Sequence, residues 1–410
     1  KLNMEVLQRT ANRGSISTGF DINNSVKLED DNTEYLQRPA SGSDGSRRTM
    51  TISMWLKRTE IDDDQIFISQ GSNIRFRFKP NYFHIRLTNG SSTYEIEDEN
   101  RFFRDTSAWY HLVVAIDTTQ STASNRVKIY WNGVQQTSFT AANYPSQNDD
   151  LTLGNFSATT MQLGYFVEGG YGFNGYFAEV HYVDGTQVAQ TEFGEFDDDS
   201  GIWKPKEYTG GHGSEGFHLK FEDSSNLGLD SSGNSNNFNL TNITAADQAT
   251  DTPTNSFCTL NPLWTWTYTM GVSDGATKVN NTVTAWGGAK GSIGVNSGKW
   301  YWEHGSFSGN DTMFGIQNQA GGGNAQAYLD AYTLAIQANA NVIQFTDPSN
   351  RTEAFSKTFS ISDIWGVALD LDNNTIAFYR NGSIVNSAFS IDGLIGNGEF
   401  FPFVTHYGSG

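Results

Sequence analysis

Residues 109–117 read WYHLVVAID, a short and almost wholly apolar run that ends at an aspartate. Its length and its β-branched and aromatic residues are typical of a buried strand. A second run, VKIYW at residues 127–131, is followed directly by Asn132 and Gly133. This dipeptide favours the positive φ angles of a two-residue hairpin turn. We therefore predict a buried strand at 109–117 and a strand at 127–134 that runs into a tight hairpin.

The same signals recur along the chain. Apolar and polar residues alternate in IRFRF at 74–78 and in FHIRL at 83–87. Alternation with period two indicates half-buried antiparallel strands, and helical periodicity is almost wholly missing. Further Asn-Gly pairs stand at residues 89–90, 174–175 and 381–382. The sequence therefore predicts an all-β protein built of antiparallel β-sandwiches.

Composition bounds the size of the protein and its partners. A chain of 410 residues is long enough for two or three domains. Its net charge of −19 argues against binding to nucleic acid or to an anionic membrane, because both require clustered Lys and Arg. Cys258 is the single cysteine, so no intramolecular disulfide is possible. No apolar run approaches the roughly 20 residues of a spanning helix, and we expect no membrane insertion.

Changes of pattern along the chain predict its division. Residues 1–17 are polar and form an N-terminal arm in this interpretation. Strand signals fill residues 18–200 and again residues 263–410, which predicts two tandem sandwiches. Residues 201–262 are poorer in strand signals and carry a stretch rich in Ser, Asn and Gly. We predict that they form a connecting segment packed on the first domain.

Four motifs in the first block occur in a specific order. TISMWLKR at 51–58 alternates, with Ile52, Met54 and Leu56 on one face, and precedes the two runs described above. YGFNGYFAEV at 171–180 then turns and enters a closing strand. This order resembles the laminin-G-like, concanavalin-A-like jelly roll. The resemblance implies a domain that binds glycans or proteins at its loop ends or on its concave sheet.

The resemblance directs attention to two kinds of side chain in loops. Exposed aromatic rings stack on sugar rings, and the candidates here are Tyr144, Tyr165 and Tyr171, for which buried packing is the alternative. Some members of the family also hold calcium through loop oxygens. The candidate calcium ligands are Asp62, Asp63, Asp64, Asp149 and Asp150. The alternative for these acidic runs is that they form solvated loops, because calcium needs six or more converging oxygens.

The second block carries another set of motifs. These are SGKWYWE at 297–303, DIWGVALDLDNN at 363–374, TIAFYRNG at 375–382 and FFPFV at 400–404. Over residues 265–410 the block resembles the SPRY domain. The resemblance implies an antiparallel sandwich that binds a protein partner through its loops. One such loop here is the Gly-rich segment at residues 321–324. We predict that Trp300, Trp302, Phe378 and Phe403 lie in its core. Asp370 and Asp372 are expected to cap a turn.

The sequence offers no convincing catalytic constellation. A retaining glycosidase needs two carboxylates about 5 Å apart. The nearest acidic cluster contains Glu95 and Glu97, which we expect at a loop edge before Arg101. No zinc-protease motif, nucleophile elbow or P-loop is present. We predict that the protein is not an enzyme.

Four segments from residue 193 onward suggest an origin. FGEF at 193–196, IWKP at 202–205, GFHLKF at 216–221 and DSSGN at 230–234 resemble structural proteins of marine bacteriophages, of the fibre type. The resemblance implies an extracellular protein of the virion surface, a tail fibre or capsid fibre. It would bind a host-surface glycan or protein, contact other virion proteins and form a homo-oligomer, for which we expect a trimer. The alternatives are a capsid or tail protein that only contacts neighbouring subunits, and a polysaccharide depolymerase.

Overall fold

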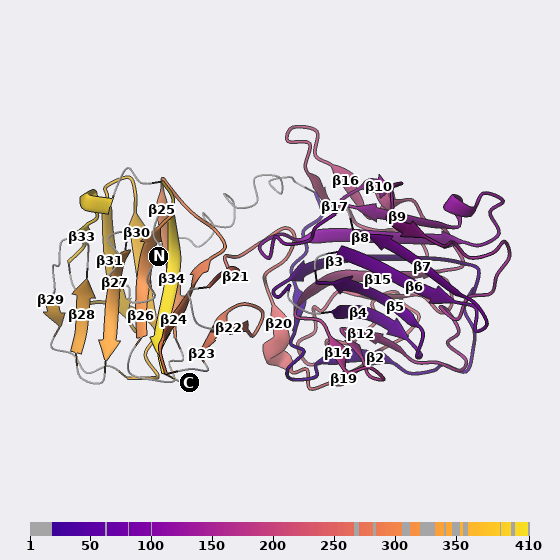
Figure 1. The fold of residues 1–410 in the computed structure, drawn as a ribbon, viewed down its shortest axis with the longest axis horizontal. Helices are drawn as coiled ribbons and strands as arrows, with labels where there is room; N and C mark the ends of the chain where they lie inside the picture. Colours follow the sequence, from indigo (N-terminus) through magenta and orange to yellow (C-terminus); the bar gives the residue numbers. More distant parts are fainter. Residues whose placement is uncertain are drawn as a thin grey trace. The chain divides into compact units, whose positions relative to one another are not determined.

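The computed structural model describes residues 19–61, 64–80, 82–99, 101–265, 270–281, 284–305, 312–319, 333–339, 342–346, 353–355, 360–385, 387–394 and 398–408. These residues form β-strands and short 3-10 turns, with no α-helix among them (Figure 1). The same residues contain no helix that is long and apolar enough to cross a bilayer. The chain forms two compact units, which divide between Phe257 and Cys258.

The first unit contains two large antiparallel sheets. The first sheet has the order β10 (Val134–Gln136), β9 (Val127–Trp131), β8 (Tyr110–Asp117), β3 (Thr49–Arg58), β15 (Gly175–Asp184), β1 (Ser25–Leu28) and β20 (Gln248–Ala249), and β18 (Phe217–Leu219) also pairs with β15. The second sheet has the order β11 (Ala141–Ala142), β7 (Thr93–Asp98), β6 (Tyr82–Thr88), β5 (Ile74–Lys79), β4 (Gln65–Gln70), β12 (Met161–Leu163), β2 (Tyr35–Arg38) and β19 (Asn239–Thr241).

The main core of this unit lies between the two sheets. Ile52, Met54 and Leu56 of β3 face it, as their alternation predicts. Phe76 of β5 and Ile85 of β6 reach the same core from the second sheet. Because side chains alternate along a strand, the intervening residues point to the outer faces of the sandwich.

A covering segment buries part of the outer face of the first sheet. Val188 and Phe193 pack against Val113 of β8, and Trp203 packs against Trp55 of β3. Trp203 belongs to a hairpin of β16 (Gly194–Phe196) and β17 (Trp203–Pro205). The sheet is therefore buried on both faces along β3, β8 and β15.

Residues 201–257 do more than connect the units. They supply β18 and β20 to the first sheet and β19 to the second. A buried ion pair of 2.8 Å between Lys57 Nζ and Asp251 Oδ2 fixes the end of this segment to β3. The segment is an integral part of the first sandwich.

The second unit is also a sandwich. One sheet has the order β21 (Leu260–Thr265), β24 (Trp286–Gly291), β34 (Phe400–Tyr407), β26 (Thr312–Asn318), β27 (Thr333–Asn339), β28 (Val342–Thr346) and β29 (Glu353–Phe355). The other sheet has the order β25 (Lys299–His304), β30 (Trp365–Asp370), β31 (Thr375–Arg380) and β32 (Ser383–Ile384). The strand β33 (Phe389–Ser390) also pairs with β31. A separate two-stranded sheet is formed by β22 (Met270–Ser273) and β23 (Lys278–Asn281).

The core of the second unit contains the aromatic residues that the sequence places there. Trp300 and Phe378 are buried in its main cluster, Trp302 packs against that cluster, and Phe403 lies in a smaller one. The turn prediction for Asp370 is also confirmed, since its Oδ1 accepts hydrogen bonds from the backbone N–H groups of Asp372 and Asn373.

The Asn-Gly pairs divide into two groups. Asn132–Gly133 and Asn381–Gly382 have positive φ at both residues and form the predicted hairpin turns. The pair at 89–90 also lies in a hairpin, between β6 and β7, but in a longer loop in which only the glycine has positive φ. For the pair at 174–175 the prediction is wrong, because only the glycine has positive φ and no hairpin joins the flanking strands. The Asn174 side chain instead accepts a hydrogen bond from Asp30 N–H at 2.7 Å and donates one to Glu60.

Replacement of Gly133 by alanine is expected to be unusually costly. A methyl group there would lie 2.2 Å from the Trp203 ring, whereas one at Gly90 would contact nothing within 4 Å. Both glycines have positive φ, so each substitution costs about 1 kcal/mol of backbone strain. Overpacking against Trp203 should add about 1–3 kcal/mol at Gly133 only. Urea unfolding of the full chain measures both variants, and equal losses would show that Trp203 does not pack there.

Candidate ligand-binding face

The outer face of the second sheet is rich in cations. Ile74, Phe76 and Phe78 of β5 face the core, so Arg75 and Arg77 point outward. Arg86 of β6 lies directly opposite Arg75, and His84 lies opposite Arg77. In a chain with a net charge of −19, this concentration of guanidinium groups is a local exception.

Ion pairs neutralise only part of this face. Arg77 Nη1 contacts Asp64 Oδ2 at 2.8 Å, and Lys79 Nζ contacts Glu97 Oε1 at 2.7 Å. Arg86 Nε is 3.9 Å from Glu95, which is too long for a hydrogen bond. Within the described residues, the buried Nε atoms of Arg75 and Arg86 both lack a hydrogen-bond acceptor.

An aromatic hairpin borders these arginines. It is formed by β13 (Tyr165–Phe166) and β14 (Tyr171–Gly172), and the Ser69 hydroxyl of β4 donates a hydrogen bond to the Tyr165 carbonyl at 2.9 Å. Tyr165 stacks on Tyr35 of β2 with ring centroids 5.6 Å apart. The Arg75 guanidinium lies 4.2 Å from the centre of the Phe166 ring. Tyr171, opposite Phe166 in the hairpin, is 43 % exposed.

We call this group the aromatic–arginine face and define it by Tyr35, Arg75, Arg86, Tyr165, Phe166 and Tyr171. Burial lowers the pKa of Arg75, and the neighbouring cations Arg86 and Arg77 lower it further. A bound anion would stabilise the charged form of such a guanidinium, because the anion offsets both the burial and the repulsion from the neighbouring cations. Flat aromatic rings beside it suit a flat apolar partner. The face has the chemistry to bind a ring that carries an acidic group.

The structure brings together two of the predicted ligand residues. Tyr165 and Tyr171 share the hairpin, but Tyr144 is half-buried and packs against the main core at the β11 edge of the sheet. Sequence reasoning missed Tyr35, Arg75 and Phe166. Phe166 follows Tyr165 directly in the same Gly-rich segment, so that segment could have pointed to it. Arg75 had no turn signal, and only strand pairing places it beside the tyrosines.

The predicted calcium ligands have other partners. Asp62 and Asp63 lie outside the described residues, and Asp64 pairs with Arg77. Asp149 Oδ2 accepts hydrogen bonds from the Tyr94 hydroxyl and the Ser146 N–H, while Asp150 pairs with Arg48 at 2.7 Å. In the described part of the chain, no group of carboxylates converges as a metal site. The Gly-rich loop at residues 321–324, which the sequence predicts to bind a protein partner, also lies outside the described residues.

The acidic pair considered for catalysis is placed differently from the prediction. Glu95 and Glu97 are not at a loop edge; they lie within β7, opposite Arg86 and His84 of β6. Burial first and the nearby cations second lower the pKa of His84 to about 3. Its Nδ1 accepts a hydrogen bond from Arg77 Nε at 3.0 Å, so the neutral ring keeps its proton on Nε2.

A buried serine–histidine pair in the first sheet does not have the tautomer of a catalytic pair. His111 Nε2 lies 2.9 Å from Ser53 Oγ, and His111 Nδ1 lies 2.9 Å from Trp203 Nε1. An indole N–H can only donate, so Nδ1 accepts and Nε2 carries the proton toward Ser53. Burial lowers the pKa of His111 to about 3. The ring therefore cannot take a proton from Ser53, and it is a buried histidine with a hydrogen-bond partner at each nitrogen.

The described residues of both units form antiparallel β-sandwiches. Residues 30–190 match the family model for the concanavalin A-like lectin/glucanases superfamily, Laminin_G_3, and residues 299–410 match that for the SPRY domain. The chain thus carries a laminin-G-like jelly roll followed by a SPRY domain. Domains of both kinds are typically non-catalytic binding domains.

Two solved structures resemble part of the chain. One is the SPRY domain of human HERC1, with 20 % identity over 37 % of this chain and 91 % of that chain, at a TM-score of 0.31. The other is the TRIM65 PSpry domain, with 14 % identity over 37 % of this chain and 85 % of that chain, also at a TM-score of 0.31. No curated protein matches the chain.

Proposed function

We propose that this chain is a non-enzymatic protein of a bacteriophage virion surface, a tail fibre or capsid fibre, whose first domain binds a host-surface glycan through the aromatic–arginine face. The observation that carries the glycan assignment is the exposed Tyr171 ring, which lies opposite Phe166 in a hairpin, while the Phe166 ring lies 4.2 Å from the Arg75 guanidinium. Because Arg75 and Arg86 place two guanidinium groups side by side on this face, the glycan we propose carries carboxylate or sulfate groups.

The remaining assignments rest on the sequence. Segments around Trp203 and His218 resemble phage structural proteins, which supports the virion. The SPRY domain supports a protein partner, from the host surface or from the virion itself.

An antibody against the chain should label intact particles and block their adsorption. Light scattering of the purified chain should give a molecular mass of three copies. Unlabelled particles would refute the virion assignment, and a monomer would refute the trimer.

A glycan array tests the binding function. The full chain should bind acidic glycans, and Tyr171→Ala should reduce that binding about tenfold, because aromatic stacking contributes about 0.5–1.5 kcal/mol beyond area burial. Tyr407→Ala is a matched control, since Tyr407 is 40 % exposed but belongs to the second unit. A chain that binds no glycan, or equal losses in both variants, would refute the proposal.

Bound glycan must also remain intact. Incubation of the full chain with its acidic glycan should release no oligosaccharide. Release that stops on replacement of Glu95 or Glu97 would show a depolymerase instead.

A further inference from the structure

An irregularity in β15 brings a carboxylate onto the outer face of the first sheet. One extra residue is inserted between Ala178, which pairs with Trp55, and His181, which pairs with Ser53. Glu179 in this bulge has a φ of 47°, in the left-handed region that residues with side chains rarely adopt. Bulges re-aim side chains and are frequent beside functional sites. Here the bulge holds a carboxylate that is only 7 % exposed.

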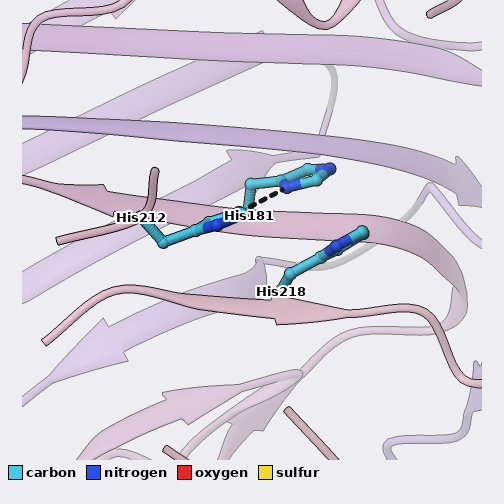
Figure 2. A group of neighbouring side chains, drawn as sticks. All are labelled: His181, His212 and His218. Carbon is cyan, nitrogen blue, oxygen red and sulfur yellow. Dashed lines mark hydrogen bonds between the residues drawn. The ribbon is translucent and has the colours of Figure 1, made fainter. Parts of the chain in front are cut away.

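Three histidines gather beside this carboxylate. His218 of β18 is the cross-strand neighbour of His181, and His212 lies in the loop before β18. The His181 and His218 rings stack with centroids 3.8 Å apart, and the His181 and His212 rings are almost parallel. Figure 2 shows the three rings grouped, with the hydrogen bond between His181 and His212. One ring nitrogen from each lies within 4.8 Å of the others, and all three residues are buried.

Glu179 determines which nitrogens are free to bind an ion. Its Oε2 lies 2.7 Å from His218 Nε2 and 3.4 Å from His181 Nε2. An ionised carboxylate only accepts, so both Nε2 atoms carry protons and both Nδ1 atoms keep their lone pairs. His181 Nδ1 accepts a hydrogen bond from His212 Nε2 at 3.1 Å, so an ion bound by these two nitrogens would take the place of that proton, which moves to His212 Nδ1. Two nitrogens bound to one tetrahedral zinc ion at their usual bond lengths are separated by about 3.3 Å.

The carboxylate of Glu179 is buried beside the His181 and His218 rings. Among the described residues, its ion pairs are with these two histidines alone. A buried carboxylate costs free energy unless it is paired, and a metal ion bound to the imidazoles that it contacts would supply the positive charge.

We propose that His181, His212 and His218 bind one divalent transition-metal ion of the zinc class, with Glu179 as the carboxylate that orients His181 and His218. Imidazole nitrogens select such ions, whereas calcium requires oxygen ligands. A carboxylate that accepts the distal N–H of a metal-binding histidine is the common outer-shell partner of zinc. The ion joins β15, β18 and the loop before β18, and its role is structural.

Metal titration of the full chain tests the site. After treatment with EDTA and desalting, calorimetry with zinc chloride should give one zinc ion per chain, and zinc should raise the unfolding temperature of the first unit. Calcium chloride should do neither. Cobalt chloride should produce the visible d–d absorption of a nitrogen-bound ion, which needs no variant to interpret.

Three variants separate the roles of the residues. His212→Gln, in a loop, should abolish the stoichiometric zinc binding and the cobalt spectrum. Glu179→Gln should weaken zinc binding about 10- to 100-fold but keep one ion per chain, since loss of an outer-shell partner has that effect. His304→Gln, in the second unit, should behave as wild type.

The proposal is wrong if the wild-type chain binds no stoichiometric zinc and gives no cobalt spectrum, or if calcium stabilises it equally. It is also wrong if His212→Gln, shown by circular dichroism to be folded, binds zinc with unchanged affinity.

Discussion

Asp251→Ala is expected to destabilise the first unit by about 3–5 kcal/mol, because it removes one partner of a buried ion pair. Lys57 is fully buried, and its ammonium donates to Asp251 Oδ2 at 2.8 Å. Without the carboxylate, the Phe257 carbonyl at 3.3 Å is the acceptor that remains to this ammonium among the described residues. Asp251 Oδ1 also accepts a hydrogen bond of 2.8 Å from Trp109 Nε1, which is lost as well.

The double variant Lys57→Met with Asp251→Ala is the control. It removes the buried charge together with its partner, and it should recover much of the lost stability since no uncompensated ion remains. Urea unfolding of the full chain gives the free energies. If the single variant loses less than about 1 kcal/mol, the segment that ends near Asp251 is not fixed to β3 by this pair.

Trp131→Ala is expected to cost about 3–5 kcal/mol, through lost packing and the cavity left behind. Trp131 of β9 is 1 % exposed, and its ring centre lies 4.5 Å from that of Phe103 and 5.0 Å from that of Phe83. Its indole N–H has no hydrogen-bond partner among the described residues, so the loss is one of packing.

Phe102→Ala provides the comparison for Trp131→Ala. Phe102 is 60 % exposed, and its truncation should change the free energy of unfolding by no more than about 0.5 kcal/mol. Equal effects of the two variants in urea unfolding would mean that Trp131 does not lie in the core between the sheets.

Strands and turns were predictable where the deciding signal is local. Alternation placed Ile52, Met54 and Leu56 on the core face, and Asn132–Gly133 formed the expected turn. The same dipeptide misled at Asn174, whose amide serves long-range hydrogen bonds rather than a hairpin. A dipeptide cannot distinguish these two uses.

The candidate ligand face was only partly predictable. Tyr165 and Tyr171 stood out because they lie in a Gly-rich segment. Tyr35 and Arg75 join them through the pairing of β12 with β2 and β4, and of β4 with β5, which connects residues far apart in the chain. Long-range pairing leaves no local signal in a single sequence.

The histidine cluster was missed for a related reason. A search for closely spaced metal ligands finds none here, because the cluster depends on the pairing of β15 with the short strand β18. Residues 201–262 showed little strand pattern, so nothing predicted that His218 would lie opposite His181. The bulge at Glu179 is equally invisible in the sequence, since it requires the left-handed backbone of a residue that is not glycine.

The most direct test of binding by the aromatic–arginine face is calorimetry with one acidic polysaccharide from the array and its carboxyl-reduced form. The wild-type chain should bind the acidic form at least tenfold more tightly, because a hydrogen bond to a charged group contributes about 1.5–3 kcal/mol. Arg75→Gln should lose that preference while its affinity for the reduced form stays the same. Equal wild-type affinity for the two forms, or an unchanged preference in Arg75→Gln, would contradict the account.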